Sequence, residues 1–218
     1  MYDFKLLAKV RQKLEGQIPF LSMLCERMKS EKPYQGLRII HKVPVTLCTV
    51  VKVEALLLGG ADVVVSSTKA VSPQPKAVKI LRDANVAVNF DQGIPGSFDL
   101  NLDCCAELID CEPKIGTVEL TQTGSCRYKA ASLNYPVISV DDCQLKSLET
   151  IGTGYSFIEG FTNLTGQNLR GKKVILFGYG KVGRGIVHAL QTQTQHVVIV
   201  EKNDFIINTL KRQGFNAI

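Results

Sequence analysis

The stretch that decides the fold is FGYGKVGRG, residues 177–185, in which three glycines form the pattern G-x-G-x-x-G. It follows Val174–Phe177, an apolar run with the length of a buried strand, and it opens a helical segment that includes Ile186–Leu190. A second strand pattern, Val197–Glu201, ends on an acid at the expected distance, and a third begins at Asn216–Ile218. The glycine pattern alone is weak, but together with these elements it predicts a dinucleotide-binding unit.

Each part of this unit has a physical role toward a dinucleotide. The glycines allow a tight turn and close approach of the backbone to pyrophosphate, and the helix amino terminus offers N–H groups and a positive dipole. Glu201 would accept hydrogen bonds from the ribose hydroxyls, which favours NAD, although the neighbouring Lys202 leaves NADP open. A strand–turn–helix that needs glycine only for packing is the alternative. The expected cofactor-binding residues of this segment are Gly178, Tyr179, Gly180, Lys181, Val182, Gly183 and Glu201.

Upstream of this unit, strand-length apolar runs alternate with helical stretches. The expected strands are Leu37–Ile40, Asp62–Ser66, Val86–Phe90, Leu100–Asp103, Thr117–Thr121 and Val137–Val140. The expected helices are Leu47–Leu58 and Gln74–Asp83, and Asp91–Ser97 is the clearest loop. This alternation predicts an α/β fold with a doubly wound parallel sheet.

A change of character at residues 141–165 suggests a second domain. We place the boundary near residue 150, which gives a substrate-type α/β domain over 1–150 and a partial Rossmann domain over 151–218. Ser156–Leu164 is expected as a helix packed on the second domain. The third strand of that domain starts where the sequence ends, so we expect an incomplete Rossmann sheet with an exposed edge.

Bulk properties exclude several classes of protein. The 218 residues carry 45% hydrophobic and 21% charged residues without an apolar run of membrane-spanning length, so we expect a cytoplasmic protein. The formal charge of +6 is scattered rather than clustered, which argues against nucleic acid as a partner. Seven cysteines without a C-x-x-C pair, with only three histidines, predict no metal site and mostly buried, reduced thiols. Cys104, Cys105 and Cys111 form the one cluster where a reactive thiol is worth considering. Packed or exposed roles are expected for His41 and His188.

Several segments match the pattern of a known enzyme family. They are Ile18-Pro19 through Arg27, Arg38-Ile39, PVISVDD at residues 136–142, the glycine stretch 177–185 and the acid-ended strand in VVIVEKN at residues 197–203. With these segments the chain resembles a divergent and truncated member of the S-adenosylhomocysteine hydrolase family, and the last two look like the family's cofactor motif. The resemblance implies bound NAD, which oxidises the 3′-hydroxyl of a nucleoside and later reduces the ketone, and it implies self-association.

The same resemblance assigns candidate residues in the first domain. Lys146 matches the lysine that takes the 3′-hydroxyl proton, and Cys104 stands where the family has a catalytic aspartate. Thr46, Thr49 and Gln74 match substrate-binding positions, although Thr46 and Thr49 also suit a helix cap. Cofactor-binding positions are matched by Thr121, Gln122 and Thr123.

At least three acid or base positions of the family are substituted here, which makes ordinary hydrolysis doubtful. The leading hypothesis is an NAD-binding adenosylhomocysteinase-like protein that binds or acts on an adenosine-like ligand, with altered or lost catalysis. One rival is a non-catalytic paralogue that senses NAD or a nucleoside. The other rival is a different two-domain NAD-dependent dehydrogenase.

Overall fold

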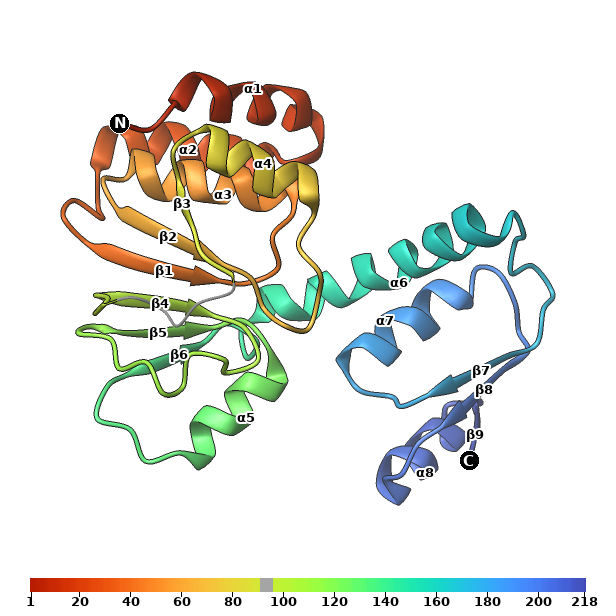
Figure 1. The fold of residues 1–218 in the computed structure, drawn as a ribbon. Coiled ribbons are helices and arrows are strands. Elements are labelled where there is room, and N and C mark those ends of the chain that lie inside the picture. Colours follow the sequence, from red (N-terminus) through yellow and green to blue (C-terminus); the bar gives the residue numbers. More distant parts are fainter. Residues whose placement is uncertain (91–95) are drawn as a thin grey trace. The chain divides into compact units, whose positions relative to one another are not determined.

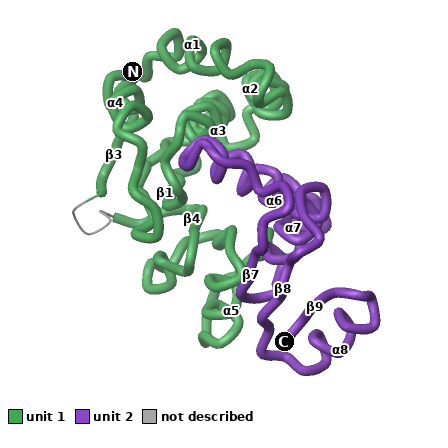
Figure 2. The backbone as a smooth tube through the Cα atoms, turned by 90° about the vertical axis from the view of Figure 1, so that its right-hand side faces the viewer, with its two compact units in different colours: residues 1–142 green, residues 143–218 purple. Residues whose placement is uncertain are grey.

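The computed structural model describes residues 1–90 and 96–218 (Figure 1). Within them the chain divides into two compact units, residues 1–142 and 143–218 (Figure 2). The division lies at 142/143 rather than near residue 150, because Gln144–Thr165 is one continuous helix, α6, that a boundary at 150 would cut. The expected loop at Asp91–Ser97 lies largely outside the described residues.

Unit 1 is built on six parallel strands in the order β3-β2-β1-β4-β5-β6. Their bounds are β1 (Arg38–Lys42), β2 (Asp62–Ser66), β3 (Ala87–Val88), β4 (Leu100–Asp103), β5 (Gly116–Glu119) and β6 (Val137–Ser139). The helices are α1 (Phe4–Leu14), α2 (Pro19–Glu31), α3 (Leu47–Leu58), α4 (Pro75–Asp83) and α5 (Gln122–Ala130), with a 3₁₀ turn at Glu15–Gln17. Figure 1 shows α1 to α4 on one face of the sheet and α5 on the other, which confirms the doubly wound α/β prediction.

The central strands are buried on both faces, as their β-branched composition predicts. Ile39 of β1 packs in the core under α1 to α4, whereas the next residue, Ile40, packs with Val64 and Phe98 on the opposite face. β1 pairs with β2 on one side and with β4 on the other, so the strand order reverses between β1 and β4. In doubly wound sheets this reversal, at the carboxyl ends of the strands, is where ligands bind.

Unit 2 has a three-stranded parallel sheet in the order β7-β8-β9. Its elements after α6 are β7 (Val174–Phe177), α7 (Lys181–Leu190), β8 (Val197–Val200), α8 (Asp204–Arg212) and β9 (Asn216–Ala217). One core joins both helices to the sheet through Val187, Ile199, Leu210 and Ala217. This strand–helix alternation confirms the predicted partial Rossmann unit.

Helix α6 packs tightly against α7, and two glycines allow the close approach. A Cβ atom on Gly154 would collide with the backbone of Gly185, and one on Gly185 would collide with the carbonyl of Thr150. The expected helix Ser156–Leu164 is the second half of α6, which begins earlier, at Gln144. Among the described residues, α6 included, no helix has the length and apolarity needed to cross a membrane.

Candidate functional site

The glycine turn between β7 and α7 has the backbone that its sequence predicts. Gly178 adopts φ +90°, a left-handed conformation that side chains rarely tolerate. A Cβ atom at Gly183 would collide with the carbonyl oxygen of Gly178, so helix and turn can meet only at glycine. Gly180 is the N-cap residue of α7, and no side chain caps this terminus. No side-chain cap therefore competes for the N–H groups of this helix amino end, and such groups can bind an anion.

Glu201 lies directly after β8 and is tied to this turn. Its Oε2 accepts a hydrogen bond from the Tyr179 N–H at 2.8 Å, and its Oε1 accepts from the Lys202 N–H at 2.8 Å and the Asn203 N–H at 3.2 Å. The bond from the Tyr179 N–H is the main reason that the pKa of Glu201 lies below its ordinary value. The carboxylate thus stays ionised at neutral pH and keeps acceptor capacity on Oε2.

A hollow of about 590 Å³ opens beside this carboxylate. Tyr179, Gly180 and Glu201 line it together with Arg184 and the exposed ring of Phe205. Of the other predicted residues, Val182 is 55% exposed on the first turn of α7 and does not line the hollow, and neither does Lys181. Arg184 and Phe205 were not predicted from sequence. For Arg184 a signal was available, since a basic residue directly follows Gly183, the last glycine of the G-x-G-x-x-G pattern.

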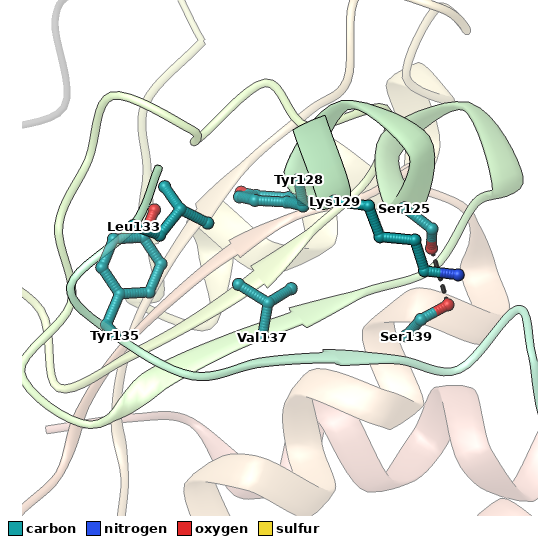
Figure 3. A pocket seen from close by; sticks show the side chains of 7 residues that line it. All are labelled: Ser125, Tyr128, Lys129, Leu133, Tyr135, Val137 and Ser139. Carbon is teal, nitrogen blue, oxygen red and sulfur yellow. Dashed lines mark hydrogen bonds between the residues drawn. The ribbon is translucent and has the colours of Figure 1, made fainter. Parts of the chain in front are cut away.

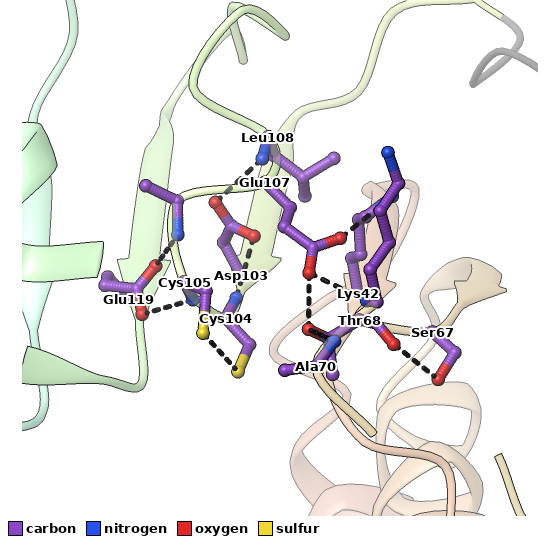
Figure 4. A network of polar contacts seen from close by, with 12 residues as sticks. Lys42, Ser67, Thr68, Ala70, Asp103, Cys104, Cys105, Glu107, Leu108 and Glu119 are labelled. Atoms are coloured by element: carbon purple, nitrogen blue, oxygen red, sulfur yellow. Dashed lines mark hydrogen bonds and ion pairs between the residues drawn. The ribbon is translucent and has the colours of Figure 1, made fainter. Parts of the chain in front are cut away.

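In unit 1 a network of polar groups occupies the carboxyl ends of β4 and β5 (Figure 4). Asp103 is fully buried; it accepts hydrogen bonds from the Cys104 N–H, the Leu108 N–H and the Tyr128 hydroxyl. Burial raises the pKa of Asp103, and these donors oppose the rise. The carboxylate therefore serves to hold the loop after β4 rather than to face a ligand.

Glu119 holds the same loop from β5. Its carboxylate accepts from the N–H groups of Cys105 at 3.1 Å and Ala106 at 3.0 Å. Both residues are left-handed, with φ +66° and +52°. Left-handed backbone disfavours residues with a side chain, so the Glu119 bonds maintain a conformation that the local sequence does not favour.

The two predicted catalytic residues differ in their surroundings. Cys104 is buried, and burial raises the pKa of its thiol to about 12. At neutral pH it is a neutral thiol, which cannot replace an aspartate as a general base. Lys146 lies in the first turn of α6, with its Nζ 2.8 Å from Oε2 of Glu149.

The predicted substrate residues have local structural roles. Thr46 is the N-cap of α3, and its hydroxyl accepts from the Thr49 N–H at 3.3 Å. Thr49 donates its own hydroxyl to the carbonyl of Pro44 at 2.7 Å, and Gln74 accepts from the Leu47 N–H at 3.2 Å. These three side chains are brought together at the amino end of α3, and each satisfies backbone there.

The expectation that Thr121 ends a strand is wrong. β5 ends at Glu119, and Thr121 is the N-cap of α5, accepting from the Gly124 N–H and donating to Glu119. Gln122 and Thr123 are exposed in the first turn of that helix. The helix was missed because its sequence, QTGSCRYKA, has no clear apolar period.

The site at the strand reversal contains residues that sequence reasoning missed. The Nζ of Lys42, at the end of β1, lies 3.5 Å from Oε2 of Glu107, and both side chains are largely buried. Glu107 also accepts from the Thr68 hydroxyl and the Lys69 N–H, which joins the loop after β2 to the loop after β4 (Figure 4). A hollow of about 370 Å³ lies here, lined by Lys42, Lys69, Cys105, Glu107 and others. The missing signal was the strand order, which brings these loops together.

A smaller hollow of about 240 Å³ lies between α5 and β6 (Figure 3). Tyr128, Tyr135 and Val137 line it, and the hydroxyls of Ser125 and Ser139 are 2.6 Å apart at its side. None of the predicted site residues lines it.

Cysteines and histidines depart in part from expectation. The prediction of mostly buried thiols is wrong: only Cys25 and Cys104 are buried, because most of the others lie on outer faces of helices or in loops. All seven are free thiols.

His41 is fully buried in β1 as a packed residue, and His188 is exposed with its ring against Tyr155. Among the described residues, no group of three or more His, Cys, Asp and Glu side chains is placed to hold a metal ion.

Known proteins match both the end of this chain and nearly its whole length. The TrkA-N domain family matches residues 174–218. The adenosylhomocysteinase of Sulfurisphaera tokodaii is 31% identical over 94% of this chain and 55% of its own length. The S-inosyl-L-homocysteine hydrolase of Methanosarcina acetivorans is 29% identical over 100% of this chain and 61% of its own. The chain is similar to the adenosylhomocysteinase family over nearly its whole length.

The chain spans little more than half the length of these two relatives. Among solved structures, a dipicolinate synthase from Bacillus halodurans matches with a TM-score of 0.44 at 13% identity, over 84% of this chain and 68% of that one.

Proposed function

We propose that this chain binds NAD through unit 2 and that unit 1 binds a nucleoside-type ligand, with the hydrolysis typical of the family altered or lost. The observation that carries the NAD assignment is the glycine turn with its acid. Gly178 is left-handed, Gly183 admits no side chain, and Glu201 is ionised beside the hollow. These are the features that a dinucleotide needs for its pyrophosphate and ribose.

The residues present fit the cofactor. The backbone of Gly180 and the α7 terminus would hold the pyrophosphate, and the hollow lined by Glu201 and Phe205 would hold the adenosine half. Glu201 would repel a 2′-phosphate, which favours NAD over NADP. When bound, the nicotinamide would supply hydride transfer.

The nucleoside ligand rests on the similarity to adenosylhomocysteinases and on the strand reversal of unit 1. One relative is an adenosylhomocysteinase and another is an S-inosyl-L-homocysteine hydrolase, so either base is a candidate. Thr46, Thr49 and Gln74 stay candidate contacts even though their hydroxyl and amide groups serve α3. Lys146 stays the candidate base for a ribose hydroxyl. Gln122 and Thr123 stay candidate contacts from the exposed first turn of α5.

A second candidate, a non-catalytic sensor of NAD or nucleoside, is favoured by one observation. Cys104, at the position of the family's catalytic aspartate, is buried with a thiol pKa of about 12. A group that stays protonated at neutral pH cannot accept a proton from substrate. The sensor would bind the same ligands without turning them over.

Absorbance at 340 nm separates the two. Purified chain is loaded with NAD, excess is removed, and adenosine or inosine is added. A stoichiometric rise that Lys146→Met abolishes supports altered catalysis. Retained NAD without a rise supports the sensor, and failure to retain NAD contradicts the proposal.

A further inference from the structure

The contact between the adjacent residues Cys104 and Cys105 plays no part in the proposed function. Their Sγ atoms lie 3.8 Å apart, in van der Waals contact, and Figure 4 shows the two sulfurs turned toward each other. Adjacent side chains in regular strands or helices point away from each other. Here the left-handed backbone at Cys105 and the bonds from Glu119 place both thiols on one side.

The two thiols differ in access. Cys105 is half-buried and lines the 370 Å³ hollow at the strand reversal, whereas Cys104 is 4% exposed. A reagent that enters the hollow therefore reaches Cys105 first, and Cys104 lies behind it within contact distance. This is the arrangement of an attacking thiol and a resolving thiol.

We propose that Cys104 and Cys105 form a reversible dithiol–disulfide site that exchanges with low-molecular-weight disulfides. The Cys105 thiolate attacks one sulfur of the small disulfide; a mixed disulfide forms and one small thiolate leaves. The Cys104 sulfur then attacks Cys105, its proton passing to the first small thiolate, and the second small thiolate leaves with the proton that Cys105 gave up. Two protein thiols are oxidised to one disulfide, and one small disulfide is reduced to two thiols.

The resulting bond is of the labile kind. Neighbouring Cα atoms are about 3.8 Å apart, below the ~4.4–6.8 Å of ordinary disulfides. Strained disulfides are easily reduced and are the regulatory ones. Formation of the disulfide also requires Cys105 to shift, and its N–H donates hydrogen bonds to both Glu119 and Thr121. Oxidation therefore alters the loop that borders the hollow.

Mass spectrometry after incubation with oxidised glutathione tests the proposal. The tryptic peptide 83–114 carries Cys104, Cys105 and Cys111. We expect it to lose the mass of two hydrogens, with fragments locating the bond between Cys104 and Cys105, and to recover that mass with dithiothreitol. Cys105→Ser should abolish the loss, whereas Cys126→Ser, at an exposed cysteine of α5, should leave it unchanged.

A measurement on the unaltered chain covers the case in which Cys105→Ser does not fold. Phenylarsine oxide, which needs two neighbouring thiols, should bind one per chain and protect Cys104 and Cys105 from alkylation. A stable glutathione adduct on Cys105, a bond to Cys111, or a fully reduced peptide while Cys126 is modified would each overturn the proposal. None of these outcomes depends on NAD or nucleoside binding.

Discussion

Replacing Glu119 by glutamine tests how the loop after β4 is held. The buried carboxylate accepts four hydrogen bonds: on Oε1 from the Cys105 N–H and from the N–H and hydroxyl of Thr121, and on Oε2 from the Ala106 N–H. Glutamine can keep its carbonyl at the Oε1 position, but its NH₂ then faces the Ala106 N–H. One charge-assisted bond is lost, at about 1.5–3 kcal/mol, and a buried donor is left unpaired, at about 1–3 kcal/mol. We expect Glu119→Gln to lower the free energy of unfolding by about 3–5 kcal/mol.

Urea denaturation followed by circular dichroism measures this loss, with Glu112→Gln as the matched control. Glu112 is exposed in the segment between β4 and β5, so its substitution should change stability by less than about 0.5 kcal/mol. Ala106→Gly should be neutral or slightly stabilising, because glycine tolerates the left-handed backbone. A loss below about 1 kcal/mol for Glu119→Gln would refute the view that this carboxylate maintains the loop.

Two further predictions concern packing and pH. Gly154→Ala and Gly185→Ala each place a Cβ against backbone between α6 and α7 and should destabilise unit 2 by at least about 1–3 kcal/mol. The Cβ of Gly160→Ala meets open space, so this control should stabilise unit 2 by up to about 1 kcal/mol. Equal effects of the three substitutions in thermal denaturation would refute the packing account. His41 is fully buried, and burial holds its pKa well below 6.5, so only the unfolded chain is protonated as the pH falls below that value. Stability should therefore drop by up to about 1.4 kcal/mol per pH unit below about pH 6.5, and His41→Leu should remove that component.

Sequence alone predicted what depends on local pattern. The β-branched run Asp62–Ser66 is β2 with the same bounds, and the glycine stretch forms the expected turn. Both signals are short-range. The β-branched run is typical of a strand buried on two faces, and the glycines stand where no Cβ fits. The apolar periods of α3 and α4 are equally local.

What sequence could not supply depends on long-range contacts. Thr121 was expected on a strand, but it caps α5 by accepting from the Gly124 N–H. Its bonds with Glu119 and Cys105 also brace the loop after β4. The pairing of Lys42 with Glu107 spans two strands that become neighbours only through the reversed strand order. Candidate residues chosen by resemblance, such as Thr46, proved to serve helix ends.

Calorimetric titration with NAD tests the central claim most directly. The unaltered chain should bind one NAD, and Gly160→Ala should bind it with the same affinity. Gly183→Ala, which forces a Cβ against the Gly178 carbonyl, should weaken binding at least about tenfold, or ~1.4 kcal/mol, while circular dichroism shows the chain still folded. No saturable binding by the unaltered chain, or equal affinity in Gly183→Ala, would contradict the assignment of unit 2 as an NAD site.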